Sequence, residues 1–482
     1  MTEEIKNTLR DSKFAKWFVL GIISFSMFAG YLFADVIAPL ETQIKATYGW
    51  SGSDYGFVTG AYAWFNVFFG MLIIVGIILD KKGIRFSTLM SGILMVVGAV
   101  IKYTSFVISL PGYTIFGIPM PVLMAAFGYA IFGVGLEYAG VTISKIVVKW
   151  FKGKELALSM GLWVSVGRLG SACALFLGPI IAKKFSVSTP IFIGVLLLFI
   201  GSLSLLLYNI QDKKLDKQLG IAKSTVNADD EFKMSDILII VKNRGFWLIS
   251  ILCVLFYSSV FPFFKYASGL MINKYGISEE WSGLIPSLVP FGTILLTPIF
   301  GSYYDKKGKG ASIMIIGSLI LFVVHVILFL PIKNIWIIGF DMILLGIAFS
   351  LVPSAMWPAV SKIIPEKQLG TAFAGVSYVQ NIGAFFIIPM LIGYVLDKSN
   401  PAIVTLTENF RLQFEKAGLN TEQIGDKIQT LKNAGTIPAL NYSVTWFIFI
   451  GLAILALFFA FWLKSDDKRK GYGLELPNKH EN

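Results

Sequence analysis

Two opposite charges, Glu137 and Arg168, lie at matching positions in consecutive apolar segments. Glu137 lies 14 residues before Phe151 and Arg168 lies 15 residues after Gly153, on either side of one short polar loop. In helices, both would lie about 21–23 Å from that loop, near mid-membrane. A carboxylate binds an ammonium and a guanidinium binds a carboxylate, so the pair suits a small zwitterion. The two charges could instead form a permanent ion pair, or one that substrate opens.

A second pair of opposite charges, Asp35 and Lys265, lies in the first and seventh apolar segments. Each lies 18–20 residues from the inner end of its segment, which corresponds to about 27–30 Å along a helix. We therefore expect an outer gate in which the two side chains meet across two halves of the protein. The alternative is that each side chain only reaches the nearby membrane surface.

A short polar loop occurs twice, at residues 76–85 and 301–310. Each copy places an acid, two lysines and a glycine between two apolar segments, and the acids Asp80 and Asp305 lie 225 positions apart. Such a repeat is typical of a duplicated transporter. We expect Asp80 to pair with Arg85 and to brace one half against the other when an inner gate is closed, with Asp305 in the corresponding place. The alternative is that the basic residues only orient the chain in the membrane.

Aromatic and amide side chains in the same segments could line a cavity around these charges. We rank Tyr257 and Trp357 first among the aromatics, and Gln380 and Asn381 as groups that could bond a peptide backbone, although interhelical bonding is the alternative. The other aromatic candidates are Tyr31, Tyr62, Trp163 and Tyr378. Lys102 and Lys145 lie near span ends and are expected to reach the membrane surface, and Asp341 lies near an external end. His325 is expected in a helix contact, with a proton relay as the alternative.

The composition identifies the elements that must position these residues as membrane helices. Of the 482 residues, 55% are hydrophobic and only 15% are charged, against about 25% in soluble domains. Mean hydropathy is +0.72. We therefore predict an all-α membrane protein with twelve transmembrane helices in two six-helix halves. The spans fall at about 17–40, 55–79, 86–107, 120–148, 155–182, 188–209, 245–272, 281–303, 312–331, 335–362, 368–396 and 442–463.

Polar segments divide the chain into regions. The N-terminal half covers 1–209, a cytoplasmic linker covers 210–244, the C-terminal half covers 245–463, and a cytoplasmic tail covers 464–482. A polar insert at 397–440 separates the last two spans and must be external. Apolar residues recur at helical spacing within it, which predicts a short helix or a helical hairpin.

The net charge of +12 could indicate a nucleic-acid partner, but its distribution argues against one. Lysine and arginine are concentrated in the segments that would face the cytoplasm, which is the positive-inside pattern and places both termini there. The sequence contains no nucleotide-binding glycine-rich motif, no clustered metal ligands and no nucleophile–base set, so we expect no cofactor and no enzymatic activity. The expected partners are a small-molecule substrate and the lipid bilayer.

Eight short strings resemble one branch of the major facilitator superfamily, the lysosomal dipeptide transporter group. They are Phe132–Glu137, Trp150–Leu156, Gly167–Ser171, Tyr257–Phe263, Leu345–Ser350, Ala355–Pro358, Pro365–Thr371 and Gln380–Gly383. The resemblance implies that Glu137 and Arg168 bind the two termini of a dipeptide, that the repeated loops act as gates, and that the protein functions as a monomer. A lysine-, isoleucine- and asparagine-rich chain without sorting signals favours a bacterial inner membrane.

Two other functions remain open at this stage. The protein could carry small organic anions, with Arg168 and Lys265 as the anion site, or it could be a sensor that moves no solute. Glu137 at the depth of Arg168 favours a zwitterion. The chain shows no attached signalling domain.

Overall fold

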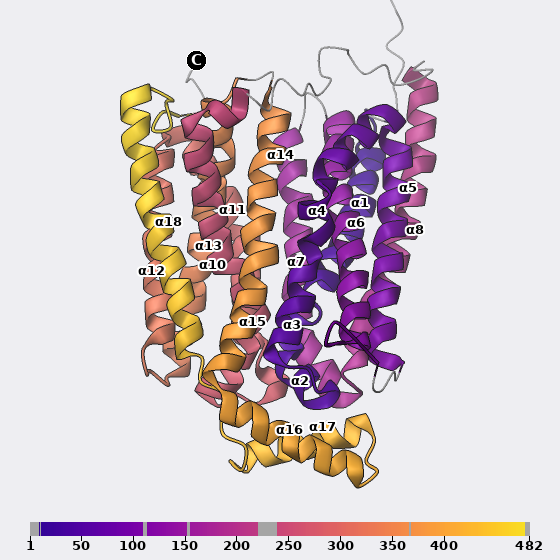
Figure 1. Ribbon diagram of the computed structural model, residues 1–482. Coiled ribbons are helices and arrows are strands. Elements are labelled where there is room, and N and C mark those ends of the chain that lie inside the picture. The colour runs from indigo at the N-terminus through magenta and orange to yellow at the C-terminus, as the bar shows by residue number, and fades with distance from the viewer. Residues whose placement is uncertain are drawn as a thin grey trace, which may run out of the picture.

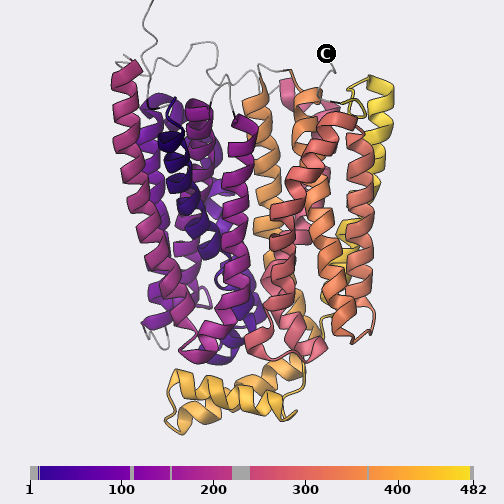
Figure 2. The same ribbon diagram turned by 180° about the vertical axis from the view of Figure 1, so that it is seen from behind.

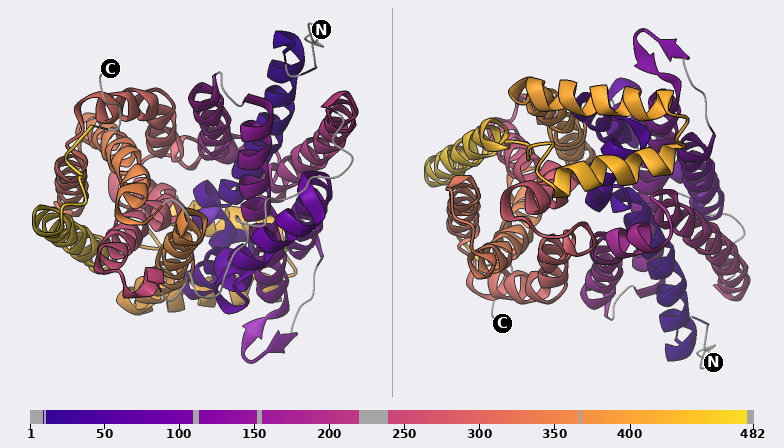
Figure 3. Two further views of the ribbon diagram at one scale, coloured as in Figure 1. Left: turned by 90° about the horizontal axis from the view of Figure 1, so that it is seen from above. Right: turned by 90° about the horizontal axis from the view of Figure 1, so that it is seen from below.

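The computed structural model describes residue 9 and residues 11–108, 113–151, 155–219, 239–365 and 368–477. Two groups of long helices stand side by side with their axes roughly parallel (Figure 1). The opposite view shows the same division into an N-terminal and a C-terminal half (Figure 2). Viewed along the helix axes, each half forms its own bundle (Figure 3).

The N-terminal half contains six spans, two of which are built from several helices. The first span is α1 (Lys13–Asp35), η1 (Ala38–Leu40) and α2 (Glu41–Tyr48). The second consists of α3 (Gly52–Gly60), η2 (Ala61–Ala63), α4 (Trp64–Phe68) and the beginning of α5 (Met71–Val107), whose remainder is the third span. A two-residue hairpin, β1 (Thr114–Ile115) with β2 (Ile118–Pro119), precedes α6 (Met120–Phe151), α7 (Leu156–Lys184) and α8 (Ser188–Leu219).

The C-terminal half repeats this layout. Its first four spans are α10 (Arg244–Tyr275), η4 (Glu279–Trp281) with α11 (Leu284–Lys307), α12 (Gly310–Phe329) and α13 (Ile335–Ile363). The fifth is interrupted, since α14 (Leu369–Gln380) passes into the π-helix η6 (Asn381–Ile387) before α15 (Ile388–Ser399). The last is α18 (Ser443–Lys470).

The predicted all-α fold of twelve spans in two halves is confirmed. Eleven helical segments in the described part of the chain are long and apolar enough to cross a membrane. The difference from twelve arises at α5, which contains the end of the second span and the whole third span. The dihedral angles of Gly83, φ 80° and ψ 172°, break the helix between them.

The two repeated loops share a glycine with positive φ. Gly83 has φ 80° and Gly308 has φ 68°, in the left-handed region that favours glycine. At Gly308 a side chain would also collide with the C-terminal tail, because an added Cβ would lie 2.4 Å from the carbonyl oxygen of Glu475. The pattern that marks the duplication in the sequence therefore reflects a backbone turn needed twice.

The insert between the last two spans forms a helical hairpin, as predicted. Its helices are α16 (Pro401–Lys416) and α17 (Thr421–Asn433), and Asn420 caps α17 through a capping box with Gln423. Ile424 and Ile428 of α17 form a small buried core between the helices and α2. The pair extends from α15 to beneath the N-terminal half (Figures 1 and 3). We call this end of the bundle the hairpin end, and the end with the C-terminus of α8 the linker end.

The predicted linker begins later than expected. Helix α8 continues past residue 209 to Leu219, and its extension carries Asp212, which pairs with Lys149, and Asp216, which pairs with Arg85. Most of the predicted linker, residues 220–238, lies outside the described residues.

Candidate substrate-binding site

A cavity of about 560 Å³ lies between the two halves, and all six residues predicted to bind substrate line it. The N-terminal half contributes Glu137 from α6 and Arg168 from α7. The C-terminal half contributes Tyr257, Trp357, Gln380 and Asn381 from α10, α13, α14 and η6. The structure therefore brings together residues that are more than two hundred positions apart in the chain.

The Glu137 carboxylate is held by one hydrogen bond from the same half. The hydroxyl group of Tyr62 donates to Glu137 Oε1 at 2.9 Å. Tyr62 lies in η2, the short 3-10 turn that interrupts the second span. This turn directs the phenol towards α6, so the broken helix is what places a donor beside the acid.

The guanidinium of Arg168 faces aromatic rings. Its central carbon lies 4.6 Å from the ring centroid of Phe349, 5.5 Å from that of Phe261 and 5.8 Å from that of Tyr31. Among the residues that the structure describes, no carboxylate lies within 4.0 Å of its nitrogens. The permanent Glu137–Arg168 ion pair considered above is therefore not formed, and each charge remains available to a ligand.

The C-terminal wall is aromatic with a few polar groups. Trp357 Nε1 donates to the hydroxyl oxygen of Tyr257 at 3.1 Å, which fixes both rings. The Tyr257 ring stacks on Phe261 with centroids 5.2 Å apart. Asn381 donates from Nδ2 to the carbonyl of Ser377, but its Oδ1 is buried and has no partner within the described ranges. This oxygen is a free acceptor beside the cavity, suited to a backbone N–H of a ligand.

The π-helix at Asn381–Ile387 is a feature that the sequence analysis missed. Single-turn π segments are uncommon and recur at functional sites. It places Phe385 in the cavity, where its ring lies 4.6 Å from that of Phe261 and 5.3 Å from that of Tyr62. Phe261, Phe349 and Tyr129 were not predicted either, since an aromatic residue inside an apolar span carries no sign of which neighbour it faces.

The expected contact between Asp35 and Lys265 is present at the side of the cavity nearer the hairpin end. Lys265 Nζ lies 2.7 Å from Asp35 Oδ1 and 2.9 Å from the carbonyl oxygen of Ala34. The side chain of Asp35 is 18% exposed and that of Lys265 is 8% exposed, so neither one reaches out to a membrane surface. The ion pair joins α1 of the N-terminal half to α10 of the C-terminal half.

The pairing of Asp80 with Arg85, expected when the inner gate is closed, is not present in this conformation. Asp80 instead pairs with Lys145 at 2.6 Å, and Arg85 pairs with Asp216 at 3.1 Å. Lys145, expected only to reach the membrane surface, is thus the partner of Asp80. All of these residues belong to the N-terminal half, so the loop does not brace the two halves here. In the second copy, Asp305 lies half-buried at the end of α11.

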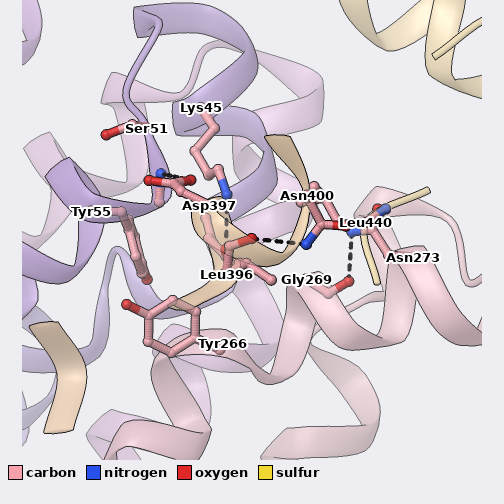
Figure 4. Close-up of polar contacts among 12 residues, drawn as sticks. Lys45, Ser51, Tyr55, Tyr266, Gly269, Asn273, Leu396, Asp397, Asn400 and Leu440 are labelled. Atoms are coloured by element: carbon pink, nitrogen blue, oxygen red, sulfur yellow. Dashed lines mark hydrogen bonds and ion pairs between the residues drawn. The ribbon is translucent and has the colours of Figure 1, made fainter. Parts of the chain in front are cut away.

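The two halves are joined at the hairpin end. Helix α3 packs against α15, and α7 packs against α11. Asp397 of α15 accepts hydrogen bonds from the backbone amides of Gly52 and Ser53, and the rings of Tyr55 and Tyr266 meet edge to face beside them (Figure 4). Towards the linker end, the cavity continues along α6 past Gly140 and Val141 to Ser144. The structure is therefore closed at the hairpin end and extends its cavity towards the linker end.

Three other ionisable or aromatic candidates lie outside the cavity lining. His325 donates from Nε2 to the carbonyl oxygen of Ser259 at 3.0 Å and stacks on Phe449, so it is a helix contact as expected. Tyr378 donates to the carbonyl of Val67 across the halves. Asp341 is fully buried near the hairpin end of α13.

Twelve spans in two similar halves, with a cavity that contains charged groups between them, are the layout of a secondary transporter. Residues 23–388 match the family model of the Major Facilitator Superfamily. The chain belongs to that family, and it is a multi-pass membrane transporter rather than an enzyme.

Curated relatives and solved structures agree with this assignment. The lysosomal dipeptide transporter MFSD1 of Homo sapiens is 30% identical over 395 residues, which cover 79% of each chain. The nitrite extrusion protein of Bacillus subtilis is 21% identical, covering 76% of this chain and 84% of that protein. A bacterial homologue of the human lysosomal transporter Spinster, inward-facing and unoccupied, has a TM-score of 0.71 at 12% identity, covering 95% of this chain and 98% of that one. The nucleoside transporter NupG has a TM-score of 0.62 at 14% identity, covering 93% of this chain and 99% of that one.

Proposed function

We propose that the protein carries dipeptides across a membrane by alternating access, with Glu137 binding the peptide ammonium and Arg168 the peptide carboxylate. The observation that supports this most strongly is that both charged groups line one cavity without pairing with each other. A charge inside a membrane protein that has no counter-ion is costly. A zwitterionic ligand would supply the missing partner to both groups at once. The relative MFSD1 of Homo sapiens, which is named a lysosomal dipeptide transporter, supports the same substrate class.

The rest of the cavity suits a substrate with variable side chains. Tyr257, Trp357 and Phe261 offer ring faces that can pack against many shapes. Gln380 and Asn381 add amide groups that could bond the single peptide link of a dipeptide. We therefore expect selection to act on the two termini and on their separation, and only weakly on side-chain identity.

The transport cycle follows from the contacts at the two ends. We assign the hairpin end to the outside and the linker end to the cytoplasm, on the positive-inside distribution of basic residues. The conformation described here is then inward-facing, with Asp35 and Lys265 as the closed outer gate. Asp80, Arg85 and Asp305 would join the halves at the inner gate in the opposite state. A bacterial inner membrane, both termini in the cytoplasm and a monomeric carrier complete the proposal.

The proposal is tested by uptake of labelled dipeptides into proteoliposomes, with and without a pH gradient. We expect saturable uptake that dipeptides of varied composition inhibit, and that N-acetylated or amidated dipeptides and single amino acids inhibit only weakly. The control variants Lys333→Ala and Glu422→Gln remove exposed charges far from the cavity and should transport normally. Absence of dipeptide uptake in a folded, reconstituted protein would refute the proposal.

A carrier of small organic anions is the second candidate. The observation in its favour is the free guanidinium of Arg168, which a single carboxylate could satisfy, with the Lys265 ammonium also lining the cavity. Inhibition by simple dicarboxylates or acetylated dipeptides as strong as that by free dipeptides would favour this candidate.

A further inference from the structure

Lys102 is a fully buried lysine that the transport scheme above leaves without a role. It lies on α5, none of its surface is exposed, and its Nζ has no hydrogen-bond partner among the residues that the structure describes. The nitrogen faces two aromatic rings, with 3.5 Å to the ring centroid of Tyr129 and 5.2 Å to that of Phe33. The expectation that a lysine near a helix end reaches the membrane surface is therefore wrong for Lys102.

This environment is a costly one for an amine. Removing an ammonium from water costs more than a neighbouring aromatic face returns. Lys102 has no ion-pair partner in the described part of the chain, and methionine would fill the same space without that penalty, so the lysine calls for a structural reason. A reason would exist if a carboxylate reached Lys102 in another conformation.

A candidate is Asp35 at the outer gate, which is linked to Lys102 through Tyr129. The Tyr129 ring covers the Lys102 nitrogen, and the Tyr129 hydroxyl donates to the carbonyl of Ala34 at 2.5 Å. The same hydroxyl lies 3.5 Å from Lys265 Nζ, which pairs with Asp35 at 2.7 Å. Lys102, Tyr129 and Asp35 belong to the N-terminal half, whereas Lys265 belongs to α10 of the other half.

Opening of the hairpin end would change the partners of Asp35. When the halves separate there, α10 carries Lys265 away from α1, and the Asp35 carboxylate is left in the N-terminal half. An unpaired charge at this depth would oppose opening. Lys102 remains in the same half as Asp35, and the ring of Tyr129 lies between its nitrogen and the gate.

We propose that Lys102 is the second partner of Asp35, and that the carboxylate transfers from Lys265 to Lys102 when the hairpin end opens. The gate aspartate is then paired in both conformations. Lys265 stabilises the closed state and Lys102 stabilises the open state. The two lysines therefore set the equilibrium between the closed and open states. This inference deepens the proposed gate but does not depend on which substrate is carried.

The test measures the conformational equilibrium of the full chain in nanodiscs without substrate. Spin labels on cysteines at Lys183 and Glu280, exposed positions of different halves at the hairpin end, report opening in a background lacking Cys173 and Cys253. We expect Lys102→Met to decrease the open population by about tenfold and Lys265→Met to increase it. Lys333→Met, which removes an exposed charge away from the cavity, should change neither.

A second comparison separates charge transfer from a packing defect. In an Asp35→Asn background there is no carboxylate to transfer, so Lys102→Met should no longer alter the open population. An unchanged or increased open population in Lys102→Met alone would overturn the proposal, and so would an equal effect of Lys102→Met with and without Asp35. Because no substrate is present, a failed dipeptide assay would leave this result unaffected.

Discussion

The carboxylate of Asp397 caps the beginning of α3 in the opposite half, accepting from the backbone amide of Ser53 at 2.6 Å. It also accepts from the amide of Gly52 at 2.8 Å and from the Ser53 hydroxyl at 2.7 Å. Amides at the start of a helix lack partners within the helix, and an anion there is favoured by the helix dipole. These three hydrogen bonds must break when the hairpin end opens, so they hold the two halves together in the closed state.

We predict that Asp397→Ala shifts the equilibrium towards the hairpin-open state. Loss of a capping carboxylate costs about 1 kcal/mol, which corresponds to roughly a fivefold change in population. Distances between spin labels at the hairpin end would measure it. Asp54 is the matched control, because it forms a capping box with Ser51 within one half. Asp54→Ala should lower thermal stability without changing the open population, and the same shift in both variants would contradict the role of Asp397.

A second prediction concerns the attachment of the hairpin. Arg411 of α16 is 7% exposed, and its guanidinium donates to the carbonyls of Lys45, Ala46 and Thr47 at the end of α2. Hydrogen bonds to charged groups contribute about 1.5–3 kcal/mol. The carbonyls at the end of α2 have no amide donors from a following helical turn, so the guanidinium is their partner. Arg411→Ala should therefore detach the hairpin and increase amide hydrogen exchange across α16 and α17.

The control for Arg411 is Lys416 on the same helix, which is exposed. Lys416→Ala should leave the exchange of both hairpin helices unchanged. Unaltered protection of α17 in Arg411→Ala would show that the apolar contacts of the hairpin suffice to hold it.

The third prediction is a pH dependence of hairpin docking. Burial lowers the pKa of Lys432 to about 8, Lys45 and Arg411 act in the same direction, and Glu279 and Glu41 oppose them. In an undocked hairpin, the Lys432 amine would have its ordinary pKa of 10.5. Between about pH 8 and pH 10.5 the undocked form therefore binds more protons than the docked form. Docking should therefore strengthen as the pH rises from about 8 to 10.5. Below pH 8, the cost of burying the protonated Lys432 amine is fully present.

Lys432→Met removes the penalty and the pH dependence together. At about pH 7, where the unperturbed amine is fully protonated, this variant should dock its hairpin more firmly than the wild type. The distance between spin labels on cysteines at Lys427 and Lys183, both exposed, would measure it. A hairpin that loosens in Lys432→Met would mean that the attraction of Glu279 and Glu41 exceeds the cost of burial.

The sequence predicted the contact of Asp35 with Lys265 and the matching depth of Glu137 and Arg168, because both predictions require only the depth of each residue along its helix. Asp35 with Lys265, and Glu137 with Arg168, were placed by counting residues from loops. The depth of a residue depends only on its own helix, so it can be predicted without knowing how the helices pack against one another. That is why the sequence could place these residues at the cavity.

The partners of the loop residues could not be predicted in the same way. Asp80 and Arg85 are close in sequence, but the turn at Gly83 places them on separate spans. Lys145 then reaches Asp80, and Asp216 on the extension of α8 reaches Arg85. These pairings depend on which helices are neighbours and on how far α8 continues, and a single sequence carries neither. The π-helix η6 was missed for a related reason, since no residue spacing distinguishes it from an α-helix.

The last prediction tests the assignment of each substrate terminus to one residue. Glu137→Gln and Arg168→Ala should each weaken dipeptide binding by about 1.5–3 kcal/mol while leaving the fold intact, as measured by calorimetry and thermal unfolding. N-acetylation of the dipeptide should cost the wild type a similar amount, because Glu137 then keeps only its bond from Tyr62. Amidation should do the same through Arg168.

The two kinds of change combine into a thermodynamic cycle. If Glu137 binds the ammonium, acetylation should cost little in Glu137→Gln but keep its full cost in Arg168→Ala. Amidation should show the reverse pattern, with its cost lost only in Arg168→Ala. Additive costs in all four combinations would mean that neither residue contacts a terminus. An exchanged pattern would mean that the dipeptide lies in the cavity in the opposite direction, with its carboxylate towards the Tyr62–Glu137 side.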